Sequence, residues 1–491
     1  MFTLSHPRSV YIRGEWVEVS ETAPVINPAT EEVICEAAVS GLDHAAAAVG
    51  AAREAFDLGP WPKMKQSERN AILSAFLDAI EARREDVIQL MIAESGATRQ
   101  GCEYFGYGTA LYLGRGYLDL ANRPAITPLP IESVPSHDGR INLAVGNMVR
   151  EPAGVVVAIT AYNAPLMLNV AKIIPAMAVG CTVVLKPSPF TPIEALMLGE
   201  FAEQAGIPAG VLNIVTGDVA VGEALTTDRR VDLISFTGSD KVGSIIMQQA
   251  APQLKRVLLE LGGKSAMIVR PDADLDAAAM AGLYGFIFQC GQGCGLHTRH
   301  IVHNSVRKAY VEKVAAMLGH VSIGDPSDPA TAVGPLINAQ ARQRSEAYVT
   351  LGLEQGGRLV AGGQRPAGLG RGFFFEPTLF DDVQNSSRIA QEEIFGPIGV
   401  VIGYDTDEEA IKIANDSDYG LSGGIFSTDI GRAHEMALAM RTGNVLLNGG
   451  PGVFSPYHPY GGYKRSGIGR EYGIEGLNEF TQVKTILFKG A

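Results

Sequence analysis

The chain has 491 residues, more than one hydrophobic core usually organises, so we expect two or three domains. Its composition, 46% hydrophobic and 19% charged, is typical of a soluble globular protein, and its formal net charge of −13 argues against a nucleic-acid or anionic-membrane partner. Five scattered cysteines form no disulfide framework and favour a reducing compartment.

The sequence carries no targeting pattern that we recognise. Met1 to Trp16 lack the basic and then apolar pattern of a signal peptide, and no apolar run approaches the roughly 18 residues of a membrane span. Cys290 and Cys294 are close in the chain, but no other cluster of His and Cys completes a zinc set, so we expect no metal. We therefore expect a cytoplasmic protein.

The first hundred residues are predicted to contain packing helices. Small apolar residues repeat over 43–57, which predicts a helix capped by Asp43. A second helix is predicted from Ser67, and a third over Val87–Ala93 that ends at Gly96. The apolar face of the second helix consists of Ile72, Leu73, Phe76, Leu77 and Ile80.

Residues 122–150 differ in composition from the helical segments before them. Four prolines exclude a helix, and His137-Asp138-Gly139 is a hairpin turn signal. Two extended arms around a turn predict a protruding ribbon, with a simple linker as the alternative.

Strand and helix then alternate over the next hundred residues. The predicted strands are 155–159, 182–185, 212–215, 233–236 and 256–259, and the predicted helices lie near 166–178, 192–205, 219–227 and 240–251. Because the strands are continuous apolar runs, this alternation predicts a parallel sheet covered on both faces. Such sheets bind ligands beyond the carboxyl ends of their strands.

A second α/β set follows Cys294. The predicted strands are 300–302, 399–403 and 444–447, and the predicted helices are 306–318, 407–415 and 430–440. A glycine-rich loop over 459–469 and a strand over 482–488 close the chain.

Cys294 follows a glycine-rich loop that would leave its sulfur accessible to a ligand. An apolar run, Phe286 to Phe288, ends in three glycines within five residues, and glycine lets a backbone turn sharply and approach a ligand. A nucleophilic sulfur needs such access, although most isolated cysteines are inert buried thiols.

Three polar residues end predicted strands or follow them. Asn163 can donate to a developing oxyanion or satisfy its own turn. Lys186 can donate to a ribose or a phosphate, or be a solvated strand end. Glu260 is a candidate general base, because partial burial raises the pKa of a carboxyl; the alternative is a pair with Lys264 or an arginine.

Two further loops could hold a nucleotide. In Phe236–Gly243 a glycine and a serine precede a helix, whose N-terminus would suit a pyrophosphate, but a plain capped turn is equally compatible. The usual dinucleotide fingerprint of three spaced glycines is absent, and Gly217–Gly222 matches it only in part. In Gln391–Pro397 an acid and an aromatic residue could hold a ribose and a flat ring, or form a turn.

These pieces occur together and in order. They closely resemble the aldehyde dehydrogenase superfamily, and the likeness runs from about Asn27 to Thr485. The segments that carry it are Asn163, Lys186, Phe236–Gly243, Glu260–Lys264, Gly291–Cys294, Glu393–Pro397 and Pro459–Glu471.

The resemblance implies an α/β fold of aldehyde dehydrogenase type, with two Rossmann-like parallel-sheet domains and a β-ribbon oligomerisation element. The implied dinucleotide-binding domain comprises 1–126 and 148–259, and the catalytic domain 260–458. The ribbon comprises 127–147 and 475–491. Homodimers or homotetramers are usual in the family.

The resemblance also implies the roles of particular residues. Cys294 is the expected nucleophile and Glu260 the base. The side chain of Asn163 and the backbone N–H of Cys294 form the expected oxyanion hole, and Glu471 exchanges protons with the base. Residues expected to bind the cofactor are Thr160, Tyr162, Lys186, Ser188, Gly222, Phe236, Gly238, Ser239, Leu261, Glu393 and Phe395. The expected substrate pocket is Ala164, Met167, Leu168, Ala171, Phe288, Phe454 and Tyr460.

The sequence departs from the family pattern at two places. Pro189 stands where NAD-specific members often carry a glutamate, so the expected cofactor is NAD with NADP left open. Tyr162 replaces a tryptophan that often precedes the oxyanion asparagine. Small residues after Asn163 suggest a roomy substrate funnel, and we expect no arginine in it.

We therefore expect oxidation of an apolar aldehyde, aromatic or branched and terpenoid compounds included, to its carboxylic acid through a thiohemiacetal and a thioester on Cys294. A CoA-acylating enzyme is the first alternative, and Glu260 argues against it. A cofactor-binding or structural protein that has lost catalysis is the second, and the retained Cys294, Asn163 and Glu260 argue against that.

Overall fold

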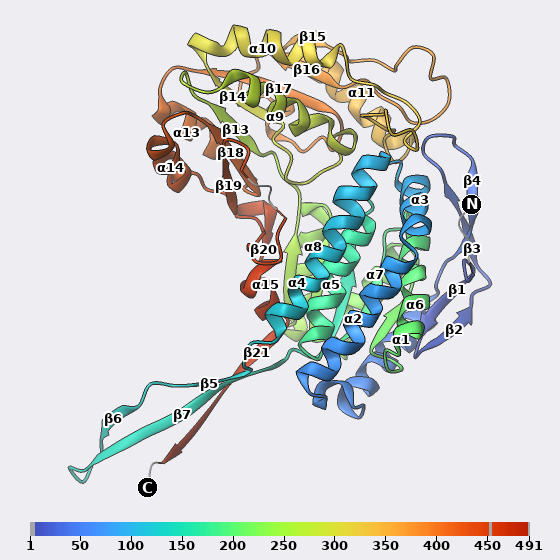
Figure 1. The fold of residues 1–491 in the computed structure, drawn as a ribbon, viewed down its shortest axis with the longest axis vertical. Coiled ribbons are helices and arrows are strands. Elements are labelled where there is room, and N and C mark those ends of the chain that lie inside the picture. Colours follow the sequence, from blue (N-terminus) through green and yellow to red (C-terminus); the bar gives the residue numbers. More distant parts are fainter. Residues whose placement is uncertain (1–4, 451–453, 490–491) are drawn as a thin grey trace.

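The computed structural model describes residues 5–450 and 454–489, and it arranges the chain as two sheet-centred bodies with a long ribbon leading away from them (Figure 1). The first sheet has eight strands in the order β2-β1-β10-β9-β8-β11-β12-β20. Its strands are β1 (Ser9–Ile12), β2 (Glu15–Glu18), β8 (Val155–Ile159), β9 (Thr182–Lys186), β10 (Leu212–Ile214), β11 (Leu233–Thr237), β12 (Arg256–Glu260) and β20 (Gly467–Ile468).

The five central strands of this sheet confirm the predicted parallel sheet. Strands β10, β9, β8, β11 and β12 pair in parallel, whereas β1, β2 and β20 join antiparallel at the edges. The connecting helices agree with the prediction within one or two residues, and are α5 (Pro165–Ala178), α6 (Pro192–Ala205), α7 (Val219–Thr227) and α8 (Asp240–Ala250). Nearly every residue of β8, β9 and β11 is buried, because helices cover both faces.

The first of the N-terminal helices packs against this sheet and the others pack against α5 and α6, and one detail of their prediction is wrong. They are α1 (Leu42–Asp57), α2 (Gln66–Ala82), α3 (Arg84–Ser95) and α4 (Thr109–Ala121), and Trp61–Lys63 forms a 3-10 turn. Asp43 does not cap α1, because the helix begins at Leu42 with Gly41 as the N-cap, which puts Asp43 inside the first turn. Gly96 ends α3 as predicted, with a left-handed φ of 71°. A two-stranded hairpin, β3 (Thr22–Ile26) and β4 (Val33–Ala38), lies beside them.

The second sheet has seven strands in the order β15-β16-β17-β14-β13-β18-β19. These are β13 (Ala266–Val269), β14 (Arg299–His303), β15 (Arg358–Ala361), β16 (Thr378–Asp381), β17 (Ile398–Tyr404), β18 (Ser422–Phe426) and β19 (Asn444–Leu447). Its helices are α9 (Leu275–Ile287), α10 (Asn304–Leu318), α11 (Ala339–Glu354), α12 (Arg388–Gln391), α13 (Asp407–Asn415) and α14 (Ile430–Ala439).

The prediction for this part was correct for three strands and three helices and missed the others. Strands β14, β17 and β19 and helices α10, α13 and α14 are confirmed. Strand β18 was missed because Gly423 and Gly424 weaken its strand signal. Gly424 has a packing reason, since a Cβ there would lie 3.0 Å from the His297 ring. Helix α9 was missed because it is apolar on nearly all sides and shows little periodicity.

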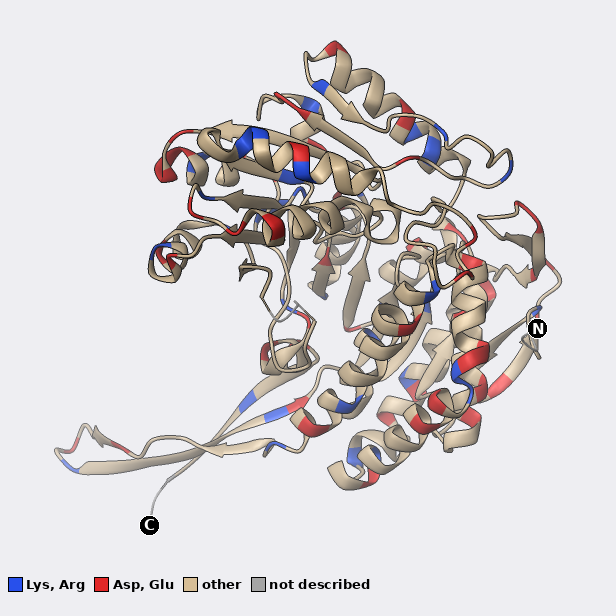
Figure 2. Ribbon diagram, turned by 45° about the horizontal axis from the view of Figure 1, so that its top comes forward, with Lys and Arg blue, Asp and Glu red and all other residues tan. Residues whose placement is uncertain are grey.

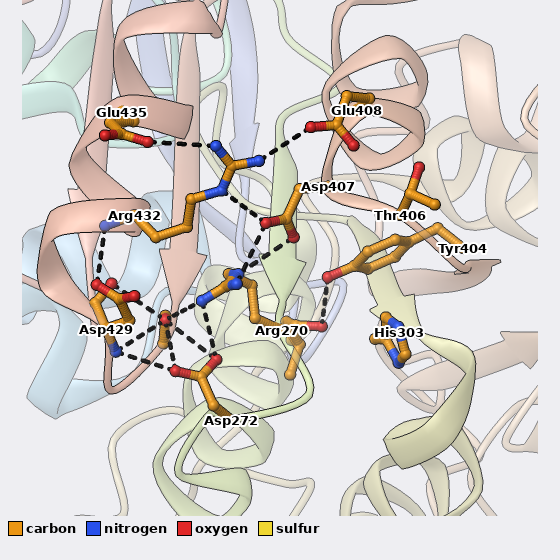
Figure 3. A network of polar contacts seen from close by, with 12 residues as sticks. Arg270, Asp272, His303, Tyr404, Thr406, Asp407, Glu408, Asp429, Arg432 and Glu435 are labelled. Atoms are coloured by element: carbon orange, nitrogen blue, oxygen red, sulfur yellow. Dashed lines mark hydrogen bonds and ion pairs between the residues drawn. The ribbon is translucent and has the colours of Figure 1, made fainter.

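The carboxyl edge of β13 and β18 is closed by an ion-pair network (Figure 3). Arg270, directly after β13, pairs with Asp272 and Asp407, and Arg432 on α14 pairs with Asp407, Glu408 and Glu435. Burial raises the pKa of Asp272, but hydrogen bonds from Asp429 N–H, Thr428 and Ser427 outweigh it and bring the pKa to about 2. This edge of the second sheet is thus filled by its own side chains.

The ribbon is confirmed as a hairpin that reaches away from the body. Strands β5 (Ile126–Pro128) and β6 (Glu132–Pro135) both pair with β7 (Ile141–Pro152), and the last strand, β21 (Thr481–Lys489), runs antiparallel along the other side of β7 (Figure 1). Large apolar side chains are exposed on it: Ile131, Ile141, Leu143, Leu487 and Phe488. The boundaries of the three expected domains stay a prediction.

Charged residues lie mainly on the outer helices and loops, and the strands of both sheets contain few of them (Figure 2). Within the described ranges, no helix combines the length and the apolar character that a membrane crossing requires. In the same ranges, His, Cys, Asp and Glu side chains form no group of three or more suited to a metal ion.

Candidate active site

A cavity of about 530 Å³ brings together residues from both sheets and from the C-terminal loops. Asn163 follows β8, Glu260 ends β12, and Cys294 follows α9. All three line this cavity together with Glu471, which lies in the isolated bridge Tyr460–Glu471 near the end of the chain. The four residues for which we expected catalytic roles therefore face one space.

The loop before Cys294 is turned by three consecutive left-handed residues. Gln289, Cys290 and Gly291 have φ angles of 48°, 56° and 73°. Only Gly291 adopts this conformation without strain, and a Cβ there would lie 2.1 Å from the carbonyl oxygen of Gly396. The loop is therefore pressed against the Glu393–Pro397 segment, and this contact places Cys294 at the cavity.

Cys294 is a half-buried residue, and its sulfur lies 3.8 Å from the hydroxyl of Tyr460. Gly295 permits this approach, because a Cβ there would be 2.7 Å from the same hydroxyl. Burial, and next the nearby Glu260, raise the pKa of the Cys294 thiol to about 12. The thiol therefore needs a base in reach before it can act as a nucleophile.

Glu260 is a buried carboxyl at the end of β12. Among the described residues, neither of its carboxyl oxygens has a hydrogen-bond partner. Burial, and next the charge of Glu471, raise its pKa well above the ordinary value, whereas Lys172 acts in the opposite direction. The alternative of a pair with Lys264 or an arginine is therefore wrong. A carboxyl with so high a pKa binds a proton tightly once it has taken one.

Lys172 is a functional candidate that the sequence analysis missed. Its Nζ donates to Glu471 Oε1 at 2.5 Å and to Ser235 Oγ at 3.1 Å, and both ionic side chains are buried. The available signal was a lone charged residue, the lysine, on a largely apolar helix, α5. A fully buried lysine needs a carboxylate partner, and here the partner lies 299 positions away in the chain.

The turn between β11 and α8 forms the opposite wall. Gly238, Ser239 and Leu261 line the cavity, and Ser239 caps α8 by accepting from the N–H of Val242 at 3.3 Å. Phe236 lies beneath this turn, and a Cβ on Gly238 would be 2.3 Å from its ring. Thr237 lines the same cavity, and its hydroxyl is buried without a partner among the described residues.

The remaining predicted cofactor residues near β8 and β9 lie outside the cavity lining. Lys186 ends β9, and burial lowers its pKa to about 8. A Cβ on Gly222 would lie 3.8 Å from Lys186 Cε, so these two are neighbours. Thr160 turns its hydroxyl inward to Asn169 Oδ1 at 2.7 Å, and the Oγ of Ser188 accepts from the N–H of Phe190. Their expected contacts with a cofactor stay predictions.

The Glu393–Phe395 segment closes this end of the cavity. Glu393 Oε1 accepts from the N–H of Gly263 at 2.9 Å, and burial raises the pKa of Glu393 to about 7. Phe395 has a left-handed φ of 56°, and its ring stands edge-on to Tyr162 with centroids 5.9 Å apart. Arg344 also lines the cavity, next to Glu393 and Tyr162. The expectation of no arginine therefore needs correction, although Arg344 lies on the Glu393 side.

Five of the residues expected to form the substrate pocket line the cavity. Met167, Leu168, Phe288, Phe454 and Tyr460 line the cavity. Ala164 and Ala171 do not, and belong to the hydrophobic core. Helix α5 is buried on all sides, so its small residues face neighbouring elements and do not widen the funnel. Apolar lining residues that were not predicted are Phe105, Tyr284, Leu296, Leu446 and Tyr472.

Known proteins are similar to this chain in sequence and in fold over nearly its full length. The profile of the aldehyde dehydrogenase family matches residues 16–486. A betaine aldehyde dehydrogenase of Bacillus subtilis (strain 168) is 37% identical over 489 residues, which cover 98% of this chain and 97% of that protein. A 3-succinoylsemialdehyde-pyridine dehydrogenase of a Pseudomonas species is 38% identical over 484 residues, 98% of each chain. The crystal structure of a betaine aldehyde dehydrogenase from Staphylococcus aureus in complex with NAD+ superposes with a TM-score of 0.94 at 36% identity, and covers 98% of this chain and 95% of that chain. This chain belongs to the aldehyde dehydrogenase family.

Proposed function

We propose that the protein oxidises an apolar aldehyde to its carboxylic acid with NAD+, through a thiohemiacetal and a thioester on Cys294. The observation that carries the proposal is the convergence of Cys294, Asn163 and Glu260 on one cavity whose other wall is a capped helix N-terminus. The family and the NAD+ complex of the related betaine aldehyde dehydrogenase support it.

The residues on the α8 side fit a nicotinamide dinucleotide. The N-terminus of α8 at Ser239 suits a pyrophosphate. The hydroxyl of Thr237 is buried without a partner among the described residues, and the Lys186 ammonium donates to the Pro187 carbonyl at the long distance of 3.5 Å. Lys186 and Glu393 would hold ribose hydroxyls, and Phe395 the nicotinamide ring. When bound, the dinucleotide supplies the acceptor for the hydride that leaves the thiohemiacetal carbon.

Cys294 starts the reaction by attacking the aldehyde carbon as a thiolate. Its pKa of about 12 means that the proton must pass to a base as the bond forms, and Glu260 lies in the same cavity. The side chain of Asn163 and the backbone N–H of Cys294 then hold the developing oxyanion. Removing one such donor typically costs on the order of 100- to 1000-fold in rate.

Glu260 acts again when the thioester is hydrolysed. Its ionised carboxylate takes a proton from water, which attacks the acyl carbon and releases the acid. The charges of the Lys172–Glu471 pair act on Glu260, because Glu471 raises its pKa and Lys172 lowers it. We infer that Glu471 exchanges protons with Glu260, as in the family, because both residues line the same cavity. A buried base in this position favours water over a CoA thiol as the acceptor.

The wall around the substrate side is aromatic and aliphatic, which supports an apolar substrate. Phe105, Met167, Leu168, Phe288 and Phe454 provide most of it. Exposed apolar residues along β7 and β21 support a homodimer or homotetramer assembled through the ribbon. A cytoplasmic location agrees with the scattered free cysteines.

Substitution of the nucleophile tests the proposal. Cys294→Ala should abolish aldehyde-dependent NADH formation and leave NAD+ binding unchanged, as measured by titration of protein fluorescence. Cys290→Ala is the matched control, because Cys290 is a buried thiol in the same loop that does not line the cavity. Oxidation by Cys294→Ala at the parent rate would refute the assignment.

A further inference from the structure

A π-helix lies where the chain reaches the substrate side of the cavity. Gly101–Gly108 is π-helical over eight residues, and α4 continues directly from it. The N–H of Thr109 bonds to the carbonyl of Tyr104, five residues back. π-helical turns are rare, and they occur frequently at functional sites.

The wider winding changes which residues of this segment face the interior. In the π-helix the buried residues recur with a spacing of five residues, as Gly101 with Gly106 and Cys102 with Tyr107. In α4 the buried residues return to a spacing of three or four, as Ala110, Leu113 and Gly114. Phe105 is partly buried on the π-helix and lines the cavity, whereas Tyr104 beside it is 75% exposed.

Neighbouring residues hold the π-helix against α3. Arg84 and Arg99 both pair with Glu103, at 3.6 Å and 3.1 Å, and the guanidinium of Arg84 lies over the ring of Tyr107. Gly106 lets α3 approach closely, because a Cβ there would be 3.3 Å from the sulfur of Met91. The position of Phe105 is therefore fixed by its surroundings.

Phe105 joins two rings that come from distant parts of the chain. Its ring stands edge-on to Phe288, with centroids 5.1 Å apart and an interplanar angle of 88°, and to Phe454, at 5.2 Å and 69°. Phe454 in turn contacts Tyr460 at 5.1 Å, and Tyr460 contacts the sulfur of Cys294. Phe105, Phe288 and Phe454, which we name the aromatic collar, thus lie beyond Tyr460 on the path from the sulfur.

We propose that Phe105 is a specificity-determining residue, which the π-helix places so that the aromatic collar selects aldehydes with an aromatic ring as substituent. The inference rests on the proposed aldehyde oxidation and names its substrate class. Aromatic rings favour edge-to-face contacts with one another, and each such contact adds about 0.5–1.5 kcal/mol to what burial of the same area gives. A saturated ring of equal size fills the same space without these contacts. Selection therefore acts on binding of the substituent, away from the reacting carbon.

The test compares phenylacetaldehyde with cyclohexylacetaldehyde, whose carbonyl groups are equally unconjugated, and uses propanal as a substrate too short to reach the collar. The variant Phe105→Leu keeps an apolar side chain but removes the ring. We expect it to lower kcat/KM for phenylacetaldehyde about three- to tenfold through KM. The values for cyclohexylacetaldehyde and propanal should change less than about twofold. Tyr104→Leu, on the same π-helix but outside the lining, should leave all three unchanged.

The outcomes separate this inference from the proposed function. Parent enzyme that oxidises propanal but does not prefer phenylacetaldehyde over the saturated ring would overturn the inference alone. Equal losses for all three aldehydes in Phe105→Leu would assign Phe105 a structural role and overturn it as well. Parent enzyme that oxidises none of the three with NAD+ or NADP+ would overturn both.

Discussion

Replacing Lys172 by methionine tests the electrostatics of the candidate site most directly. The lysine side chain is 0% exposed and that of its partner Glu471 is 3% exposed, and they meet at 2.5 Å. Methionine keeps most of the volume but removes the charge. Glu471 is then a buried carboxylate without its cation, beside a second buried carboxyl, Glu260.

The expected cost is large for a single substitution. Breaking a buried ion pair by removing one partner typically costs about 3–5 kcal/mol, which in a chain of this size should lower the melting temperature by roughly 3–5 °C. The same change removes the charge that lowers the pKa of Glu260. The pKa of Glu260 therefore rises further, and the rise of kcat with pH should move to higher pH, because the base must be ionised to act.

Thermal unfolding and the pH profile of kcat measure these two effects. The control is Lys308→Met, which breaks an exposed pair with Glu312 and should cost less than about 0.5 kcal/mol. The double variant Lys172→Met/Glu471→Leu should regain most of the lost stability, because it removes both charges. A melting temperature and a pH profile of Lys172→Met that match those of the parent would refute the reasoning.

Two further substitutions address the base and the cofactor. Glu260→Gln should accumulate the thioester and slow steady-state turnover, and an unchanged rate would point to another base. Because burial raises the pKa of Glu260 in the folded state, the unfolded chain ionises this group first as the pH rises above about 4.3, and the parent loses stability in that range. The melting temperature of Glu260→Gln relative to the parent should therefore increase from pH 4 to pH 8, and a constant difference would contradict the shift. NAD and NADP should both support turnover of the parent, since the exposed Pro189 offers no carboxylate to repel a 2′-phosphate. Pro189→Glu should lower kcat/KM with NADP by at least about tenfold and affect NAD little, whereas a parent that is silent with NADP would show that Pro189 is irrelevant.

The first sheet could be predicted from the sequence because its information is local. Strands β8, β9 and β11 are buried on both faces, so each reads as an unbroken apolar run, and the helices between them are of ordinary length. The second sheet was harder, because β18 contains two glycines that its packing requires and α9 is apolar on nearly all sides. The ribbon was predictable from its prolines and its turn.

The residues of the candidate site also fall into those that the sequence indicated and those that only the structure revealed. The sequence by itself determined which residue types stand at strand ends and in glycine-rich turns, and that was enough to single out Asn163, Glu260 and Cys294. Only the tertiary structure decided which other side chains meet around the cavity. These are Lys172 beside Glu471, Phe105 beside Phe288, and Arg344 beside Glu393. These partners are separated by long stretches of chain, and a local pattern records that a side chain is buried but not which distant side chain meets it. Ala164 and Ala171 show the converse, since their small size was visible in the sequence but the face they occupy followed from the packing of α5.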